Sequence, residues 1–382
     1  MNDCVILREI STACGRRFGH ATLNAPQRLN ALSLEMIDRL APQLTAWAAN
    51  PDIVGVLLDG TGDKAFCAGG DVAALYRAIK AVPSGQLAPQ IATFFEHEYR
   101  LDHLIHTYPK PLLCWGQGVV MGGGLGLLAG ASHRVVTPST RMAMPEITIG
   151  IYPDVGGSWF LRRMPGRAGL FLALTGAPIN AADARFAGLA DYIIDEAERA
   201  RLPALIGATH WHALDEGDSD SGSAANHARL STLLDPLSIR PANAVPTSRL
   251  RTHFDRIEAL IGNDSLADIA RRLHALIDDQ DAWLATAGNT FAHGAPSSAR
   301  LSWALWQRTR HMSLADVFRV EYIVSVACTS KADFAEGVRA LLIDKDRKPR
   351  WRHAALGDIS DSEIADYFRP RFSEAHPLAD LV

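Results

Sequence analysis

A chain of 382 residues exceeds the size at which a single hydrophobic core usually stops growing, so its length predicts two domains. With 48% hydrophobic and 21% charged residues, the composition is that of an ordinary soluble globular protein. The formal net charge of -4 offers no basic surface for a polyanion, which argues against nucleic acid as a partner.

Short β-type segments alternate with helical patterns through the first half of the chain. The predicted strands span residues 4–10, 16–24, 53–60, 111–118, 133–139, 141–146 and 189–195. Helical spacing follows Ser33, a suitable N-cap, and returns over residues 72–82. Strands that recur between helices predict an α/β core, which we place at residues 1–205.

One uncharged stretch, residues 111–132, is long enough to resemble a membrane span. It contains seven glycines and Gln117, which favour a buried strand, a tight turn and the start of a helix instead. We therefore expect no membrane association.

The segment "GLGLLA" (124–129) within this stretch matches G-x-G-x-x-A, and Glu146 follows Gly126 by 20 residues, as in a dinucleotide-binding fingerprint. The helical segment is too short for a crossover helix, however, and the next strand ends without an acid that could bind a ribose. Close packing, or a turn whose backbone N–H groups face a ligand, explains the glycines better.

A second loop of small residues, "KAFCAGGD" (64–71), also lies between a predicted strand and a predicted helix. Alone, it indicates no more than a turn with an aspartate N-cap. Two such loops could direct two N–H donors at one carbonyl oxygen, and each donor of an oxyanion hole stabilises the transition state by ~3 kcal/mol.

The composition changes to small and polar residues at 214–228, so we predict a linker or irregular region over residues 206–245. Beyond it the pattern is mostly helical, which predicts a helical C-terminal region at 246–382. Its clearest helical segments span residues 248–261, 265–277, 299–310 and 313–329.

The residues offer few candidates for a nucleophile. No G-x-S-x-G motif is present, and Cys67 has no obvious histidine partner. His210 and His212 have metal-ligand spacing beside Asp215, although an acidic surface loop explains them equally well. We therefore predict no metal site.

Two acids remain, Glu146 and Asp154, in the otherwise uncharged "MPEITIGIYPDVGG" (144–157). Ionised groups in apolar surroundings are costly unless they are paired, or unless their altered acidity is used. This pattern makes the two carboxyls the strongest candidates for chemistry.

Five cysteines form no C-x-x-C pair, which indicates a reducing compartment. The first residues resemble neither a secretory signal nor a transit peptide, because acidic and basic residues interrupt the apolar ones. We expect a cytoplasmic location.

Taken together, several motifs resemble those of the crotonase (enoyl-CoA hydratase/isomerase) superfamily, and in particular its 3-hydroxyisobutyryl-CoA hydrolase branch. The "PDVGG" after "MPE" and the run "EGVRALLIDKD" distinguish this branch from ordinary hydratases. The resemblance covers most of the chain and is weakest between about residues 205 and 295. It rests on residues 23–37, 60–76, 119–127, 141–164, 172–194 and 333–351.

The resemblance assigns roles position by position. Gly70 and Gly123 match the positions whose N–H groups form the family's oxyanion hole. Glu146 matches the catalytic glutamate shared with hydratases, and Asp154 matches the second acid of the hydrolase branch. Glu98 matches a further acid that contacts the substrate.

The same resemblance places the adenine of coenzyme A near Lys64 and Ala68, and the phosphates near Lys64 or Arg28. It also exposes one difference: hydratases carry a second glutamate where this chain has Gly126. Hydration of an enoyl double bond needs two acid/base groups acting on one water, so the loss of one disfavours hydration.

We therefore expect a crotonase-type spiral of ββα units, followed by the helical C-terminal region. The implied reaction is hydrolysis of 3-hydroxyisobutyryl-CoA, or a similar short 3-hydroxyacyl-CoA, as in valine catabolism. It needs no cofactor beyond the coenzyme A of the substrate. An enoyl-CoA hydratase or isomerase of the same fold, and a non-catalytic acyl-CoA-binding protein, remain as alternatives. The sequence leaves a homo-oligomer open.

Overall fold

The computed structural model describes residues 3–83, 86–214, 219–239 and 245–382. By its internal contacts the chain divides into two units, each assembled from three stretches. The first unit comprises Met1–Gly70, Leu101–Met142 and Ile179–Ser248. The second comprises Asp71–Arg100, Ala143–Pro178 and Arg249–Val382. The units differ from the predicted domains, because two stretches of the predicted core group with the C-terminal helices.

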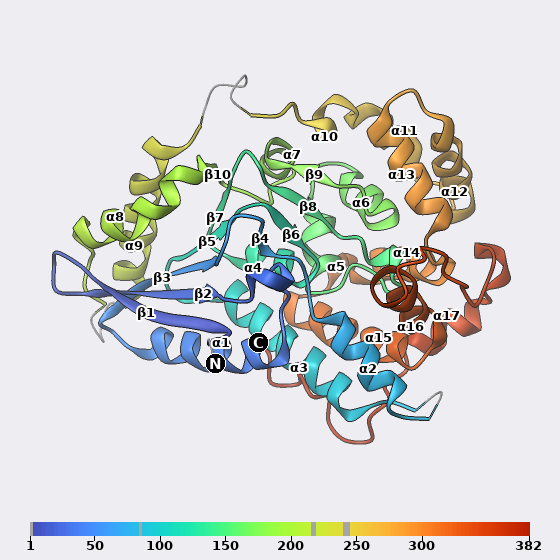
Figure 1. The fold of residues 1–382 in the computed structure, drawn as a ribbon, viewed down its shortest axis with the longest axis horizontal. Coiled ribbons are helices and arrows are strands. Elements are labelled where there is room, and N and C mark those ends of the chain that lie inside the picture. The colour runs from blue at the N-terminus through green and yellow to red at the C-terminus, as the bar shows by residue number, and fades with distance from the viewer. Residues whose placement is uncertain (1–2, 84–85, 215–218, 240–244) are drawn as a thin grey trace. The chain divides into compact units, whose positions relative to one another are not determined.

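The first unit contains a six-stranded sheet with the order β1-β2-β3-β5-β7-β10 (Figure 1). Its first two strands pair antiparallel, and the remaining neighbours pair parallel. The strands are β1 (Val5–Ser11), β2 (Arg17–Leu23), β3 (Ile53–Gly60), β5 (Leu112–Gly116), β7 (His133–Val136) and β10 (Tyr192–Ile193). All eight residues of β3 are buried, as expected for a parallel strand covered on both faces.

A smaller sheet has the order β4-β6-β8-β9. Its strands are β4 (Ala65–Cys67), β6 (Val119–Met121), β8 (Arg141–Ala143) and β9 (Ile179–Asn180). Successive strands alternate between the sheets: β3, β5 and β7 enter the large one, and β4, β6 and β8 enter the small one directly afterwards. This repeat of strand pairs matches the predicted spiral of ββα units.

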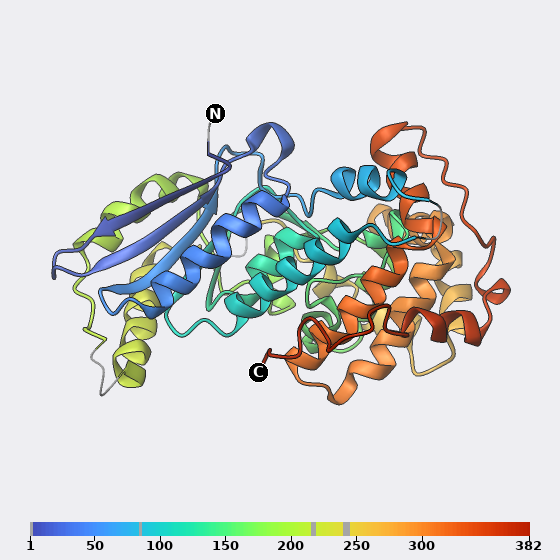
Figure 2. The same ribbon diagram turned by 90° about the horizontal axis from the view of Figure 1, so that it is seen from below.

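Among the described residues, five α-helices lie wholly in the first unit: α1 (Leu34–Ala49), α4 (Gly123–Gly130), α7 (Ala181–Phe186), α8 (Leu202–Ala208) and α9 (Ser219–Leu234). Helix α1 packs along β1–β3, and Figure 2 shows it beside these strands. Ser33 caps α1 as predicted, because its side chain accepts from the Met36 N–H. A Cβ added at Gly19 would lie 2.6 Å from the Trp47 ring, so α1 packs tightly on β2.

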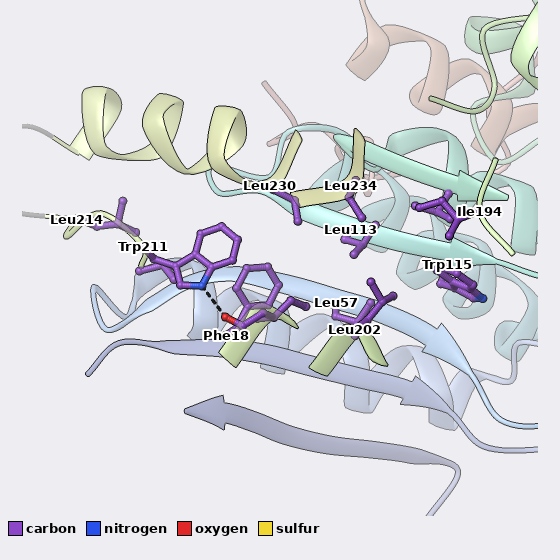
Figure 3. Close-up of a cluster of buried hydrophobic side chains, with 13 residues drawn as sticks. Phe18, Leu57, Leu113, Trp115, Ile194, Leu202, Trp211, Leu214, Leu230 and Leu234 are labelled. Carbon is purple, nitrogen blue, oxygen red and sulfur yellow. Dashed lines mark hydrogen bonds between the residues drawn. The ribbon is translucent and has the colours of Figure 1, made fainter. Parts of the chain in front are cut away.

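The prediction of an irregular region at 206–245 is wrong for much of its length, because α9 occupies Ser219–Leu234. Leu230 and Leu234 are four residues apart and fully buried in a cluster with Phe18, Leu113 and other side chains (Figure 3). Because most residues of α9 are small or polar, its narrow apolar stripe does not stand out as a helical pattern in the sequence. Residues 215–218 and 240–244 of the predicted linker lie outside the described residues.

The uncharged stretch at 111–132 forms β5, β6 and α4, which confirms the predicted strand, turn and helix start. Among the described residues, no helix combines the length and apolar character needed to cross a membrane.

The second unit is largely helical, and the predicted helical C-terminal region is confirmed. Its helices beyond residue 248 are α10 (Arg249–Thr252), α11 (Phe254–Ile261), α12 (Leu266–His274), α13 (Ala282–His293), α14 (Pro296–Arg308), α15 (Leu314–Thr329), α16 (Ala332–Val338) and α17 (Asp361–Tyr367). Earlier in the chain are α2 (Val72–Lys80), α5 (Gly157–Phe160) and α6 (Ala168–Thr175). Helix α3 (Pro89–His106) belongs to this unit up to Arg100.

Candidate active site

Three carboxyl groups are buried together in the second unit. Glu98 lies on α3, Glu146 begins the short 3-10 helix η2 (Glu146–Thr148), and Asp154 lies in the loop before α5. Their exposed fractions are 2%, 6% and 7%. The structure thus brings together the three acids that the sequence singles out.

Burial and mutual repulsion alter the acidity of all three groups. Burial raises the pKa of Glu98 well above its usual value, and the charges of Asp154 and Glu146 raise it further. Burial also raises the pKa of Glu146, with a second contribution from Asp154. Burial raises the pKa of Asp154 to about 6, against the opposing effect of a hydrogen bond with Tyr99.

One oxygen of Glu146 has no partner within the described part of the chain. Its Oε2 atom is buried and accepts no hydrogen bond. A buried polar atom without a partner is costly, and such atoms in native structures are often associated with catalysis or an absent ligand. The unpartnered oxygen, beside two further buried acids, is therefore a candidate to contact a substrate or a water.

Asp154 belongs to a continuous hydrogen-bonded chain. Its Oδ2 atom lies 2.7 Å from the Tyr99 hydroxyl, which lies 2.7 Å from the Ser325 hydroxyl. The Ser325 oxygen lies 2.8 Å from the Tyr152 hydroxyl, and Tyr152 donates to the Glu321 carbonyl oxygen at 2.7 Å. The acid is thereby fixed to α3 and to α15.

The loop that carries Asp154 has a strained backbone. Val155 has a φ of 53°, in the left-handed region that β-branched residues rarely adopt. The side chain of Glu321 accepts from the N–H groups of Gly156 and Ser158 at 2.7 and 2.9 Å. Burial raises the pKa of Glu321 to about 8, although these N–H donors oppose the shift. One buried side chain that accepts two backbone hydrogen bonds therefore holds the strained turn.

The two glycine loops meet in the first unit. A Cβ added at Gly69 would lie 3.9 Å from the Gly123 nitrogen, and one added at Gly124 would lie 2.2 Å from the Cys67 carbonyl oxygen. Gly123 is the first residue of α4, where an N–H has no partner within the helix. Gly70 immediately follows Gly69. The loops are close enough to direct N–H groups toward one oxygen, as the oxyanion hypothesis requires.

The predicted coenzyme A contacts lie near a cavity of about 200 Å³ in the first unit. Lys64 lines this cavity, whereas Arg28 is exposed on the neighbouring turn. The Ala68 N–H donates to the Leu29 carbonyl at 3.0 Å. The buried side chain of Asn30 accepts from Ala25 N–H and donates to the Thr61 and Ala65 carbonyls, which fixes the cavity walls. The cavity is lined by Pro26, Leu29, Asn30, Thr61, Gly62, Asp63, Lys64 and Ala65.

The weaker sequence candidates gain no support. The buried Cys67 thiol donates to the Gly69 carbonyl oxygen at 3.7 Å. No group of three or more His, Cys, Asp or Glu side chains in the described ranges could hold a metal ion. The predicted neighbour of the two histidines, Asp215, lies outside those ranges.

The residues that hold Asp154 in place are not among the site residues predicted from the sequence. Tyr99 directly follows Glu98, and Tyr152 precedes Asp154 by two residues, so both lie beside residues that the sequence selects. Glu321 and Ser325 are four apart in α15, which places them on one face of that helix. Because α15 also carries Asp316 and Arg319, this spacing is only a weak signal for them.

A family model and a relative of similar sequence agree on the family that this chain resembles. The family model described as Enoyl-CoA hydratase/isomerase matches residues 18–368. A Gallus gallus protein named "3-hydroxyisobutyryl-CoA hydrolase, mitochondrial" is 37% identical over 353 residues, which cover 92% of this chain and 86% of the relative.

Two solved structures also match almost end to end. An enoyl-CoA hydratase from Rhodobacter sphaeroides aligns with a TM-score of 0.78 and 33% identity, covering 96% of this chain and 98% of that one. A carnitinyl-CoA dehydratase from Mycobacterium thermoresistibile aligns with a TM-score of 0.80 and 33% identity, covering 97% of each chain. These alignments confirm the predicted crotonase-type fold.

Proposed function

The chain belongs to the enoyl-CoA hydratase/isomerase family, and within it we propose an acyl-CoA thioester hydrolase that acts on a short 3-hydroxyacyl-CoA. The proposed substrate is 3-hydroxyisobutyryl-CoA, and the products are 3-hydroxyisobutyrate and coenzyme A. The name of the Gallus gallus relative supports this substrate. The structural observation that carries the proposal is the buried, unpartnered oxygen of Glu146 beside Asp154.

In this reaction Glu146 acts on the thioester carbonyl carbon in one of two ways. It attacks the carbon to form a mixed anhydride, or it removes a proton from the water that attacks. Both roles need an ionised carboxylate with a free oxygen directed at the substrate. The unpartnered Oε2 atom supplies such an oxygen.

The other two acids serve orientation and proton transfer. Asp154 orients the substrate hydroxyl or the water and passes a proton to the departing thiolate. Glu98 accepts a hydrogen bond from the substrate hydroxyl. Both side chains are buried, so water competes poorly with the substrate for them.

The N–H groups of Gly70 and Gly123 stabilise the negative charge that develops on the thioester oxygen. Such donors act most strongly where they are fixed in advance. Gly123 at the start of α4, and Gly70 in the loop packed against it, meet that condition. Lys64, Ala68 and Arg28 contact the coenzyme A part of the substrate.

A hydratase is the second candidate, because the two similar solved structures are of proteins named as a hydratase and a dehydratase. Position 126 argues against it. Gly126 is buried within α4 and provides no carboxylate. Hydration needs two acid/base groups on one water, and this face of the site lacks the second.

The test compares the two reactions directly. Purified protein should release free thiol from 3-hydroxyisobutyryl-CoA and should produce negligible loss of enoyl absorbance with crotonyl-CoA. A thiol reagent and ultraviolet absorbance measure the two outcomes. Rapid hydration of crotonyl-CoA with little thiol release would favour the hydratase, and neither reaction would favour a non-catalytic acyl-CoA-binding protein.

The remaining expectations complete the proposal. The reaction needs no metal or redox cofactor, because carboxyls and backbone donors supply all of its steps. The protein acts in the cytoplasm on a small-molecule substrate, without nucleic acid or membrane, and it could do so as a homo-oligomer.

A further inference from the structure

The chain of contacts from Asp154 to α15 contains four short oxygen–oxygen distances. In order, Asp154, Tyr99, Ser325, Tyr152 and the Glu321 carbonyl are separated by 2.7, 2.7, 2.8 and 2.7 Å. Tyr99, Ser325 and Tyr152 are fully buried. Oxygens at such distances in a dry interior are hydrogen-bonded, and each hydrogen bond needs one hydrogen.

The hydroxyl groups supply only three of the four hydrogens, because a serine or tyrosine hydroxyl carries one each. The Glu321 carbonyl can only accept, so the Tyr152 hydrogen is committed to it. The Tyr152 oxygen must then accept from Ser325, and the Ser325 oxygen must accept from Tyr99. The Tyr99 oxygen is left to accept a hydrogen from Asp154.

The alternative arrangement, with an ionised Asp154, leaves one of the four contacts without a hydrogen. If Asp154 is ionised, Tyr99 must donate to it, and the single hydrogen of Ser325 then serves only one of its two neighbours. The other contact would place two oxygen lone pairs face to face at 2.7 or 2.8 Å. Buried polar groups without partners are costly, so the ionised arrangement is disfavoured.

From this count we propose that Asp154 is a neutral acid in the resting protein, and that it donates to Tyr99 at the head of a one-way hydrogen-bond chain. The titratable groups that interact with it are acids, phenols and a thiol. They are Glu98, Glu146, Glu321, Tyr99, Tyr152 and Cys328. None of these six can supply a positive charge to stabilise an aspartate anion. The raised pKa of Asp154 agrees in direction with the count.

The proton has a use that rests on the proposed hydrolysis. Glu146 takes a proton from water, the water oxygen bonds to the carbonyl carbon, and the carbon–sulfur bond breaks with its electron pair on sulfur. Asp154 releases its hydrogen bond to Tyr99, gives the proton to that sulfur and becomes the carboxylate, which then accepts a hydrogen bond from Tyr99. The proton held by Glu146 then restores Asp154 through solvent. Tyr99, Ser325 and Tyr152 touch no reacting atom and are positioning residues.

The first measurement is the carbonyl stretch of a neutral carboxylic acid in the infrared spectrum, assigned by its loss in Asp154→Asn. In the wild type this band should persist to about pH 6, well above the usual range of an aspartate. A band that disappears near pH 4 would overturn the proposal. This readout needs no substrate.

Three variants then shift the midpoint, the pH at which half of this band is lost. Two of them should lower it and one should raise it. Ser325→Ala and Tyr152→Phe each remove the contact that lacks a hydrogen, so the ionised form becomes acceptable and the midpoint should fall by about one pH unit. Tyr99→Phe removes the side-chain donor that stabilises the carboxylate, so the midpoint should rise. Shifts of the same sign in all three would overturn the proposal.

Ser298→Ala is the matched control, because Ser298 is also fully buried in the second unit but its hydroxyl has no partner among the described residues. It should leave the midpoint unchanged, and a shift equal to that of Ser325→Ala would overturn the proposal. Thiol release is measured separately. A neutral Asp154 without thiol release would contradict the hydrolysis alone, and thiol release with an ionised Asp154 would contradict the hydrogen-bond chain alone.

Discussion

Glu146→Gln is expected to lower turnover of 3-hydroxyisobutyryl-CoA by at least ~10²-fold, the lower end of what a positioned base contributes. The substitution preserves the shape of the side chain and removes its negative charge, so both the nucleophilic and the base role are lost. Because Glu146 is not among the predicted coenzyme A contacts and its shape is preserved, the affinity for coenzyme A should barely change. Thiol release and coenzyme A binding measure the two quantities.

Glu374→Gln is the control for this variant, because Glu374 is an exposed glutamate in the C-terminal segment of the same unit. It should retain wild-type turnover. Near-normal turnover in Glu146→Gln would remove this residue from the mechanism, whatever the fate of the other acids.

The largest effect on substrate choice should come from the 3-hydroxyl group. We expect kcat/KM for 3-hydroxyisobutyryl-CoA to exceed that for isobutyryl-CoA by at least ~10²-fold, reaching ~10⁴ in a dry site. Sites built to bond a hydroxyl reject analogues that lack it, because their own polar groups are left unpaired. Glu98 is the least exposed of the three acids, at 2%, so leaving it without a hydrogen-bond partner would cost the most free energy. Steady-state thiol release from the two thioesters measures the ratio.

Replacement of the hydroxyl's partner should reduce this selectivity. Glu98→Ala is expected to bring the two kcat/KM values closer together, chiefly through a loss with the hydroxylated substrate. Isobutyryl-CoA serves as the internal control, because any general damage to the site lowers both rates. Equal wild-type rates on the two thioesters would contradict the substrate assignment even if thioester hydrolysis stood.

The sequence predicts the site where chemistry leaves a local mark. Glu146 and Asp154 are conspicuous because they are the only charges in a long apolar segment, and the glycine loops are conspicuous by composition. The structure brings the three acids together and brings the two loops together. The residues that hold Asp154 escape detection because Tyr99 and Ser325 are separated by 226 positions, and no local pattern links them.

The fold, like the site, is predicted only where its elements leave a local pattern in the sequence. Alternating strands and helices are strong local signals, so the α/β core and the C-terminal helices are predicted correctly. Helix α9 has small and polar residues on most of its surface, and only its packing on the core reveals it. The two units interleave along the chain, which a linear change of composition cannot indicate.

The buried acid cluster also has a consequence for the free energy of unfolding. Asp154 has a pKa of about 6 in the folded protein against a usual 3.8, so between these values the folded chain keeps a proton that the unfolded chain releases. The resulting stabilisation is complete below pH 3.8 and is lost as the pH rises through 6. Its size is roughly 3 kcal/mol, at about 1.4 kcal/mol per pH unit.

Urea unfolding of the ligand-free protein at pH 4 to pH 7 should therefore show Asp154→Asn gaining stability relative to the wild type as the pH rises. A constant difference between the two proteins would contradict this expectation. A carboxyl that ionises in a dry pocket works against the fold that contains it, so the ligand-free protein should be easier to unfold above about pH 6 than below it.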